Sequence, residues 1–367
     1  MNKERLVKTF TDLVALDSPS FDEQAVCRYI KERLTALGVQ VAEDDSAAAT
    51  GSTCGNLLAT IPGDPSLEPV LFAAHMDTVE PSRGKQAVTD ENGRITSCGD
   101  TVLGADDFAG VAAILEGAAS LLESGATHPT LELLFTTGEE HFCVGAKAFD
   151  AQRLQSKTAY VMDLSGPVGD CAVAAPTLIT FSAEVMGKAA HAGFAPEDGV
   201  HAIQVAAAAN LPSGRWGDVT VNVGTISGGR ATNIVPDSCT VTGEIRALCH
   251  QDALDRLNEI HSEFVEQAQA VDAKLNFNHT IHITGYRVDT DAPVAQRFRR
   301  ACEAVGVTPR FTDTYGGSDC NILSAHGIQG LVVATAMNNC HAVNEYTTVE
   351  ELCKAGRLAQ ALMEKQD

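Results

Sequence analysis

The chain of 367 residues is long enough for two domains with substantial cores. Its formal net charge of −22 argues against nucleic acids and anionic membrane surfaces as partners, because both would repel it. The charged, amphipathic N-terminus lacks the apolar core of a signal peptide, and no segment approaches the ~20 apolar residues of a membrane span. The 11 cysteines are scattered without a C-x-x-C pair, so we expect reduced thiols in a cytoplasmic enzyme.

The first part of the chain alternates predicted helices and strands. Apolar residues recur at helical spacing in three segments, residues 4–16, 23–37 and 108–122. Strands are predicted at residues 56–61 and 70–74. Residues 86–98 are predicted to form a hairpin with Glu-Asn-Gly as its turn, and residues 46–53 a loop. A strand, a helix and a further strand then lead to Asp163. This alternation predicts an α/β domain whose mixed, mostly parallel sheet is flanked by helices.

The pattern changes at about Thr177. Strands are predicted at 177–187, 218–227, 238–248 and 274–285, with helices at 197–210 and 251–271. This β-α-β-β-α-β order is that of a ferredoxin-like α+β unit. The α/β pattern then resumes with helices at 292–306 and near Cys320 and a strand at 330–335. We therefore predict a larger domain formed by residues 1–176 and 288–367, with residues 177–287 inserted as a smaller domain.

Histidines and acids gather where the apolar runs end. They are His75 and Asp77 (VLFAAHMD), Asp106 and Asp107 (GADD), Glu139 and Glu140 (LELLFTTGEE), Asp163 (TAYVMD) and His341 (GLVVATAMNNCH). Ligands of open α/β sheets bind at the carboxyl ends of the strands. Imidazole and carboxylate without clustered thiols suit zinc or a similar divalent ion. The sequence therefore predicts a metal centre at this edge of the sheet.

His75 and Asp77 are one residue apart at a strand end, so their side chains point to the same face. Asp77 can then accept the second ring N–H of His75 and leave the other nitrogen for a metal. An isolated H-x-D is more often a buried histidine satisfied by an acid, so this pair gains weight only together with the other groups.

The paired acids have separable tasks. An aspartate at a helix entrance is usually an N-cap, so one of Asp106 and Asp107 can cap while the other bridges two cations; we assign Asp106 as the bridge. Adjacent Glu139 and Glu140 repel each other unless a cation or water separates them. One can bind metal while the other acts as general base, although a solvated loop explains such a pair equally well.

The charges balance in a way that favours hydrolysis. Two divalent cations bring four positive charges, of which Asp106, Glu140 and Asp163 remove three, while neutral His75 and His341 remove none. The remaining positive charge can hold a bridging water, lower its pKa and polarise a substrate carbonyl. The other glutamate of the pair then takes the proton and delivers it to the leaving amine.

Several motifs together resemble the di-zinc exopeptidases that include carboxypeptidase G, aminoacylase and succinyl-diaminopimelate desuccinylase. They are HMDTVEP, LGADDFAGVAAILE, TTGEEHFCVGAKAFD, YVMDLSGPVG, AHAG, GGRATNIVPD, GEIR and GGSDCNIL. D-T-V-E-P and G-A-D-D make the chain most similar to the peptidase T (tripeptide aminopeptidase) branch. The resemblance covers essentially the whole chain. It implies a zinc exopeptidase-like domain with an inserted lid, which in this family often carries the contact of a homodimer. It also implies two bound divalent ions, for which zinc is preferred over manganese or cobalt.

The resemblance also implies residue roles. The metal ligands would be His75, Asp106, Glu140, Asp163 and His341, with Asp106 bridging, His75 and Asp163 on one ion, and Glu140 and His341 on the other. Asp77 would orient His75, and Glu139 would be the general base. In the lid, the residues implied to bind the substrate carboxylate or stabilise the oxyanion are His191, Asn233 and Arg246. Three departures alter the walls of the site but remove no ligand: Phe108 where many members have Lys, His141-Phe142-Cys143 after the Glu pair, and Leu-Ser after Asp163.

Two activities fit this chemistry. The first is a metallo-aminopeptidase, tripeptidase-like, that hydrolyses short peptides; the alternative is an N-acyl-amino-acid amidohydrolase with the same dinuclear site. D-T-V-E-P favours the peptidase. A non-catalytic scaffold with the inherited fold would lack a ligand or the base, and none is missing.

Overall fold

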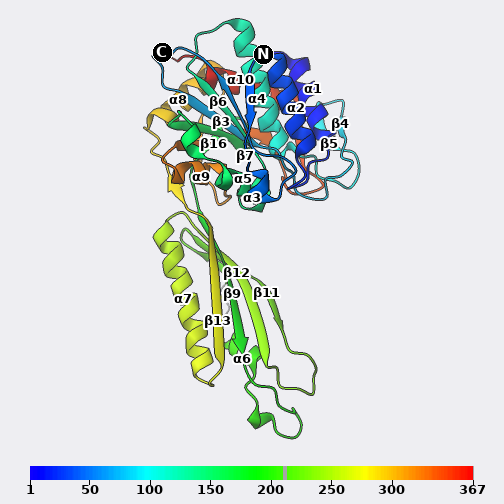
Figure 1. Ribbon diagram of the computed structural model, residues 1–367, viewed down its shortest axis with the longest axis vertical. Helices are drawn as coiled ribbons and strands as arrows, with labels where there is room; N and C mark the ends of the chain where they lie inside the picture. The colour runs from blue at the N-terminus through cyan, green and yellow to red at the C-terminus, as the bar shows by residue number, and fades with distance from the viewer. Residues whose placement is uncertain (210–212, 367) are drawn as a thin grey trace. The chain divides into compact units, whose positions relative to one another are not determined.

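The computed structural model describes residues 1–209 and 213–366, which form two compact units (Figure 1). The first unit comprises residues 1–174, 288–314 and 318–366, and the second comprises the described part of 175–287 together with Tyr315–Gly317. The predicted boundaries, after residues 176 and 287, run next to this division. Residues 175–176 and Tyr315–Gly317 are the differences, because both were expected in the larger domain. No helix in the described ranges combines the length and apolarity that a membrane span requires.

The first unit is built on a mixed sheet with strand order β1-β2-β6-β3-β7-β16-β8, and β15 pairs with β8. The parallel centre consists of β6 (Leu131–Thr136), β3 (Val70–His75), β7 (Thr158–Ser165) and β16 (Gln329–Met337). The flanking strands are β1 (Gln40–Glu43), β2 (Leu57–Ile61), β8 (Asp170–Ala175) and β15 (Arg310–Asp313), and β14 (Tyr286–Arg287) is a two-residue strand. Every residue of β3 and β6 is buried, as expected for strands covered on both faces. The predicted α/β fold with a mixed, mostly parallel centre is confirmed.

Helices flank this sheet. They are α1 (Lys3–Val14), α2 (Gln24–Ala36), α3 (Ala47–Thr50), α4 (Ala105–Ser124), α5 (Val144–Ala148), α8 (Pro293–Ala304), α9 (Asp319–Ala325) and α10 (Val349–Met363), with short 3-10 turns η1 (Glu139–His141) and η2 (Ala151–Arg153). The central helix α4 is buried along most of its length and packs against β3, β7 and α10. It ends at Gly125, whose φ of 64° is the left-handed conformation that favours glycine at a helix end.

Three local predictions differ from the structure. The segment 46–53 was predicted as a loop but contains α3, because its three alanines favour a helical turn despite the flanking Ser, Thr and Gly. Asp163 lies inside β7, which continues to Ser165, rather than at its end. The predicted hairpin forms from β4 (Ala87–Thr89) and β5 (Arg94–Ser97), but β17 (Tyr346–Thr348) adds a third strand to it.

The second unit is an antiparallel sheet with order β10-β11-β12-β9-β13. Its strands are β9 (Thr177–Met186), β10 (Gly214–Trp216), β11 (Val219–Gly228), β12 (Ser238–Ala247) and β13 (Lys274–Ile283). Without the edge strand β10, this is the ferredoxin-like order that the sequence predicts. The helix predicted at 197–210 is a 3-10 turn η3 (Pro196–Asp198) followed by α6 (Ala202–Ala208), and residue 210 lies outside the described residues. Helix α7 (His250–Gln269) buries Ala253, Leu257, Ile260 and Phe264 at helical spacing against the sheet.

Candidate metal centre

One group of three predicted ligands meets where β3, β7 and α4 converge. The ring nitrogen Nε2 of His75, the last residue of β3, lies 3.1 Å from Oδ1 of Asp106 and 3.8 Å from Oδ1 of Asp163. Zinc binds nitrogen and oxygen ligands at about 2.0–2.1 Å, so two ligands of one ion are at most about 4.2 Å apart. Both distances from His75 are within this limit, and the ligand atoms of all three side chains lie within 4.8 Å of one another, so the three could hold a single ion.

A second group of three shares Asp106. Nε2 of His341, in the loop after β16, lies 3.2 Å from Oδ2 of Asp106 and 2.9 Å from Oε1 of Glu140. Oε1 of Glu140 is nevertheless buried without an aligned hydrogen-bond donor, which fits two ligands that face a common ion better than a hydrogen-bonded pair. Asp106 thus turns one oxygen to each histidine, the arrangement of a bridging carboxylate.

The neighbouring Asp107 has a different task. Its carboxylate accepts the backbone N–H of Gly110 at 3.2 Å and that of His75 at 3.3 Å, so it caps the regular part of α4 and supports the end of β3. Asp106 and Asp107 both have non-helical backbone angles, and the peptide bond between them is cis. The sequence analysis assigned Asp106 as the bridge, and the side-chain contacts show that Asp107 is the cap.

Asp77 connects His75 to the turn that carries the paired glutamates. Nδ1 of His75 lies 3.3 Å from Oδ1 of Asp77 and 3.0 Å from its backbone carbonyl oxygen. The Asp77 carboxylate also accepts the N–H groups of Glu139 (3.0 Å) and Glu140 (3.3 Å) and the hydroxyl of Ser20 (2.6 Å). Although burial opposes ionisation, the adjacent His75 lowers the pKa of Asp77. Asp77 is therefore suited to position the ring and the turn together.

Sequence reasoning missed Glu345, a fully buried acid four residues after His341. Its Oε2 accepts the backbone N–H groups of Leu103 and Gly104, both at 2.7 Å, and its Oε1 accepts that of Asp106 at 3.0 Å. Glu345 therefore ties the loop of one predicted ligand to the turn of another. The only sequence signal is an acid shortly after His341, because its partners are backbone groups that leave no mark in the sequence.

The electrostatics of the centre favour cations. Burial raises the pKa of Glu139 and of Asp163 well above the usual carboxyl range. The adjacent carboxylates of Asp106 and Glu140 raise the pKa of His341 to about 10. The centre therefore concentrates negative charge that must be balanced by protons or by metal ions.

Comparison with known proteins assigns the family. Residues 71–365 match the model of peptidase family M20/M25/M40. The chain belongs to this family. It is therefore a peptide-bond hydrolase, as predicted, and its similarity to the peptidase T branch is confirmed.

Three similar proteins span nearly the whole chain. The chain is 35% identical to the uncharacterised protein YqjE of Bacillus subtilis, with coverage of 100% of this chain and 99% of that protein. A crystal structure of aminopeptidase PepT from Bacillus cereus has a TM-score of 0.94 and 38% identity, covering 99% of this chain and 98% of the other. A tripeptidase from Staphylococcus aureus has a TM-score of 0.96 and 29% identity with the same coverage.

In this M20 family chain, the three predicted substrate-binding residues belong to the second unit. His191 and Asn233 are exposed neighbours, since His191 forms a backbone bridge with the residue after Asn233. Nδ1 of His191 accepts the N–H of Gly193 at 3.1 Å, which leaves Nε2 as the other ring nitrogen. Arg246 is paired with Glu244 at 2.9 Å. Their role toward a substrate stays a prediction.

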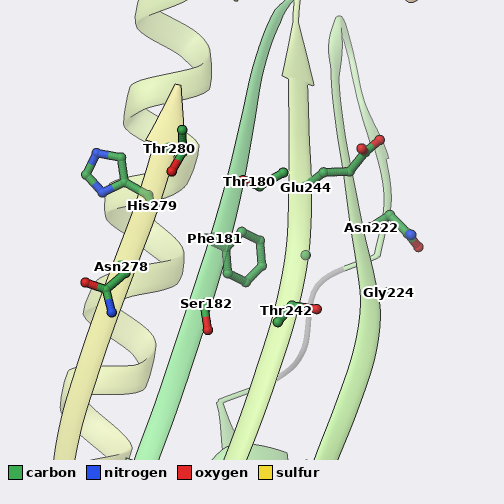
Figure 2. Close-up of a pocket in the computed structure, with 11 residues that line it drawn as sticks. Thr180, Phe181, Ser182, Asn222, Gly224, Thr242, Glu244, Asn278, His279 and Thr280 are labelled. Carbon is green, nitrogen blue, oxygen red and sulfur yellow. The ribbon is translucent and has the colours of Figure 1, made fainter. Parts of the chain in front are cut away.

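The second unit also has a hollow on its sheet (Figure 2). Its lining includes Thr180 and Ser182, which alternate along β9 with the core residues that pack against α6 and α7, so the hollow is on the other face. Hydroxyl and amide side chains line it together with Phe181 and His279, and its one acid, Glu244, pairs with Arg246. Among the described residues, the side-chain groups that could hold a metal ion all belong to the first unit instead.

Proposed function

We propose that this chain is an aminopeptidase that removes residues from short peptides, tripeptides among them, with water activated by two divalent metal ions. The observation that carries the proposal is Asp106, whose two oxygens face two different histidines, each of which has a further carboxylate beside it. The ligands would be His75, Asp106 and Asp163 for one ion, and His341, Asp106 and Glu140 for the other. Two ions so bound supply the positive charge that polarises a carbonyl and acidifies water.

The protein's own groups divide the remaining work. Glu139 is the general base that takes a proton from the attacking water and delivers it to the leaving amine. Asp77 positions both Glu139 and His75, because its carboxylate contacts the ring of one and the backbone of the other. Histidine and carboxylate donors without thiolate suit zinc, and manganese or cobalt fit the same donor set.

The second unit would serve as lid and as the contact of a homodimer. We assign its His191, Asn233 and Arg246 to the substrate carboxylate or to the oxyanion, in support of which Nδ1 of His191 is engaged by a backbone N–H, so that Nε2 is the nitrogen left to face a ligand. A cytoplasmic location is supported by the 11 cysteines, all present as thiols.

The general base is tested by changing the two adjacent glutamates separately. Glu139→Gln should retain both ions and lower kcat by about 10²–10⁴-fold, the usual scale for general acid–base groups. Glu140→Gln is the matched variant, expected to lose metal as well as activity. Metal content by elemental analysis and kcat on a tripeptide are measured for both. Wild-type turnover in Glu139→Gln would exclude it as the base.

The substrate class is tested by a screen of di- and tripeptides with zinc, manganese or cobalt added back to the metal-free enzyme. Cleavage of free-amino tripeptides supports the aminopeptidase. Turnover of N-acetyl amino acids without action on tripeptides would instead assign the alternative, an N-acyl-amino-acid deacylase.

A further inference from the structure

A second cluster of metal-binding side chains lies beside the dinuclear centre. One ligand atom each of Glu139, Cys143 and Asp319 lies within 4.8 Å of the other two. Cys143 and Asp319 are buried, and the Cys143 thiol contacts Oε1 of Glu139 at 3.4 Å. Cys143 belongs to the His-Phe-Cys stretch that departs from the family pattern, and Asp319 belongs to the Gly-Gly-Ser-Asp-Cys-Asn motif. Neither residue has a part in the proposed hydrolysis.

Asp319 has an oxygen that the protein leaves unsatisfied. Its Oδ2 accepts the hydroxyl of Thr136, whereas Oδ1 is buried without a hydrogen-bond partner and the residue is only 1% exposed. A capping box formed by Ser318 and Asn321 fixes the first turn of α9, which holds the carboxyl in place. A buried carboxylate oxygen without a donor is costly, so this position favours a cation.

The charge of the whole region leaves room for a further ion. Two divalent ions would supply four positive charges against seven carboxyl groups, those of Asp77, Asp106, Asp107, Glu139, Glu140, Asp163 and Asp319. Up to three negative charges then remain to be neutralised by protons or by another cation.

We propose that Glu139, Cys143 and Asp319 form a third site, for a thiophilic divalent cation such as zinc or cadmium, and that its occupation inhibits hydrolysis by engaging Glu139. On binding, the Cys143 thiol releases its proton to solvent as the sulfur–metal bond forms, each carboxylate supplies one oxygen, and water completes the coordination. No oxidation is involved. The inhibition rests on the proposed role of Glu139, whereas the site itself does not.

The geometry allows this cluster to hold one ion. Zinc–sulfur and zinc–oxygen bonds of about 2.3 and 2.0–2.2 Å let a sulfur and an oxygen ligand of one ion lie up to about 4.5 Å apart. The Cys143 sulfur and Oε1 of Glu139 lie 3.4 Å apart, within this limit. Because the Cys143 thiol must lose its proton to bind, whereas the dinuclear centre uses only carboxylates and imidazoles, the third site should fill after the other two.

The test loads the purified enzyme with two equivalents of zinc and then titrates it with cadmium chloride. Total bound metal per chain, the thiolate-to-cadmium charge-transfer absorption and kcat on a tripeptide are followed together. We expect a third equivalent to bind with appearance of the absorption band and parallel loss of kcat. Cys143→Ser should abolish the band and weaken third-equivalent binding by more than about 100-fold, beyond the loss seen for an outer-shell partner. Asp319→Asn should weaken binding about tenfold or more while the band persists at higher cadmium.

Controls separate this site from other thiols and from the proposed function. Cys98→Ser and Cys249→Ser remove exposed thiols and should bind the third equivalent as the wild type does. Saturation at two equivalents, or a band that survives in Cys143→Ser, overturns the site. A third ion that binds without loss of kcat overturns the inhibition alone. An enzyme that binds three ions but cleaves no peptide supports the site and refutes the proposed function.

Discussion

Glu345 offers a direct test of how the metal centre is held together. Glu345→Gln keeps the side-chain volume but replaces one acceptor oxygen with an amide that is itself a donor. If the remaining oxygen stays with Leu103 and Gly104, the N–H of Asp106 loses its partner. One buried unpaired donor costs about 1–3 kcal/mol, so we expect the free energy of unfolding of the metal-free protein to fall by that amount. Alanine would orphan three donors at about 3–9 kcal/mol, close to the whole stability of a domain, and is less informative.

The same change should weaken metal binding, because the turn that carries Asp106 is no longer fixed. A tenfold loss of affinity would add about 1.4 kcal/mol to the difference from wild type in excess zinc. Urea unfolding with and without zinc, together with chelator competition, measures both effects. Glu350→Gln, an exposed change on α10, is the control and should stay within about 0.5 kcal/mol of wild type. Wild-type unfolding and zinc retention in Glu345→Gln would refute the reasoning.

Three further predictions follow from buried contacts. Asp77→Asn should weaken metal affinity or activity about 10–100-fold, measured by metal titration, and an unchanged affinity and activity would remove its positioning role. Burial lowers the pKa of Lys85 to about 8 in the folded protein, against about 10.5 in the unfolded chain. Between these two pH values the unfolded chain binds one more proton than the folded protein. The stability of the wild type should therefore rise with pH over this window relative to Lys85→Met, by up to about 3 kcal/mol. Urea unfolding at both ends of that window checks this, and a constant difference between the two proteins would contradict it. Gly110→Ala should lower Tm and metal content. The added Cβ would lie 2.1 Å from the Met162 carbonyl oxygen and 2.3 Å from Oδ1 of Asp107. Such overpacking should lower the free energy of unfolding by about 1–3 kcal/mol or more. An unchanged Tm would mean that α4 can shift away from β7.

Local patterns in the chain predicted most of the fold. Fully apolar runs such as those of β3 and β6 identify strands buried on both faces, and the apolar stripe of α7 identifies an amphipathic helix. The acids and histidines that follow the apolar runs were recognisable for the same reason, because strand ends are visible in a few consecutive residues. The error at α3 shows the limit of such patterns, since four residues are too few for helical periodicity to appear.

The sequence by itself therefore determined the α/β class of the fold and the residue types available for metal binding, and it predicted the inserted unit. Only the tertiary structure shows the contacts themselves, with the two oxygens of Asp106 facing two different histidines and the carboxylate of Asp107 accepting the N–H of Gly110. It also revealed Glu345, bonded to backbone groups 239–242 positions away, and Asp319, bonded to Thr136 at a separation of 183. Such contacts depend on the order of the strands in the sheet and on the positions of backbone N–H groups. Neither is visible in a sequence as a periodic pattern or as a residue type.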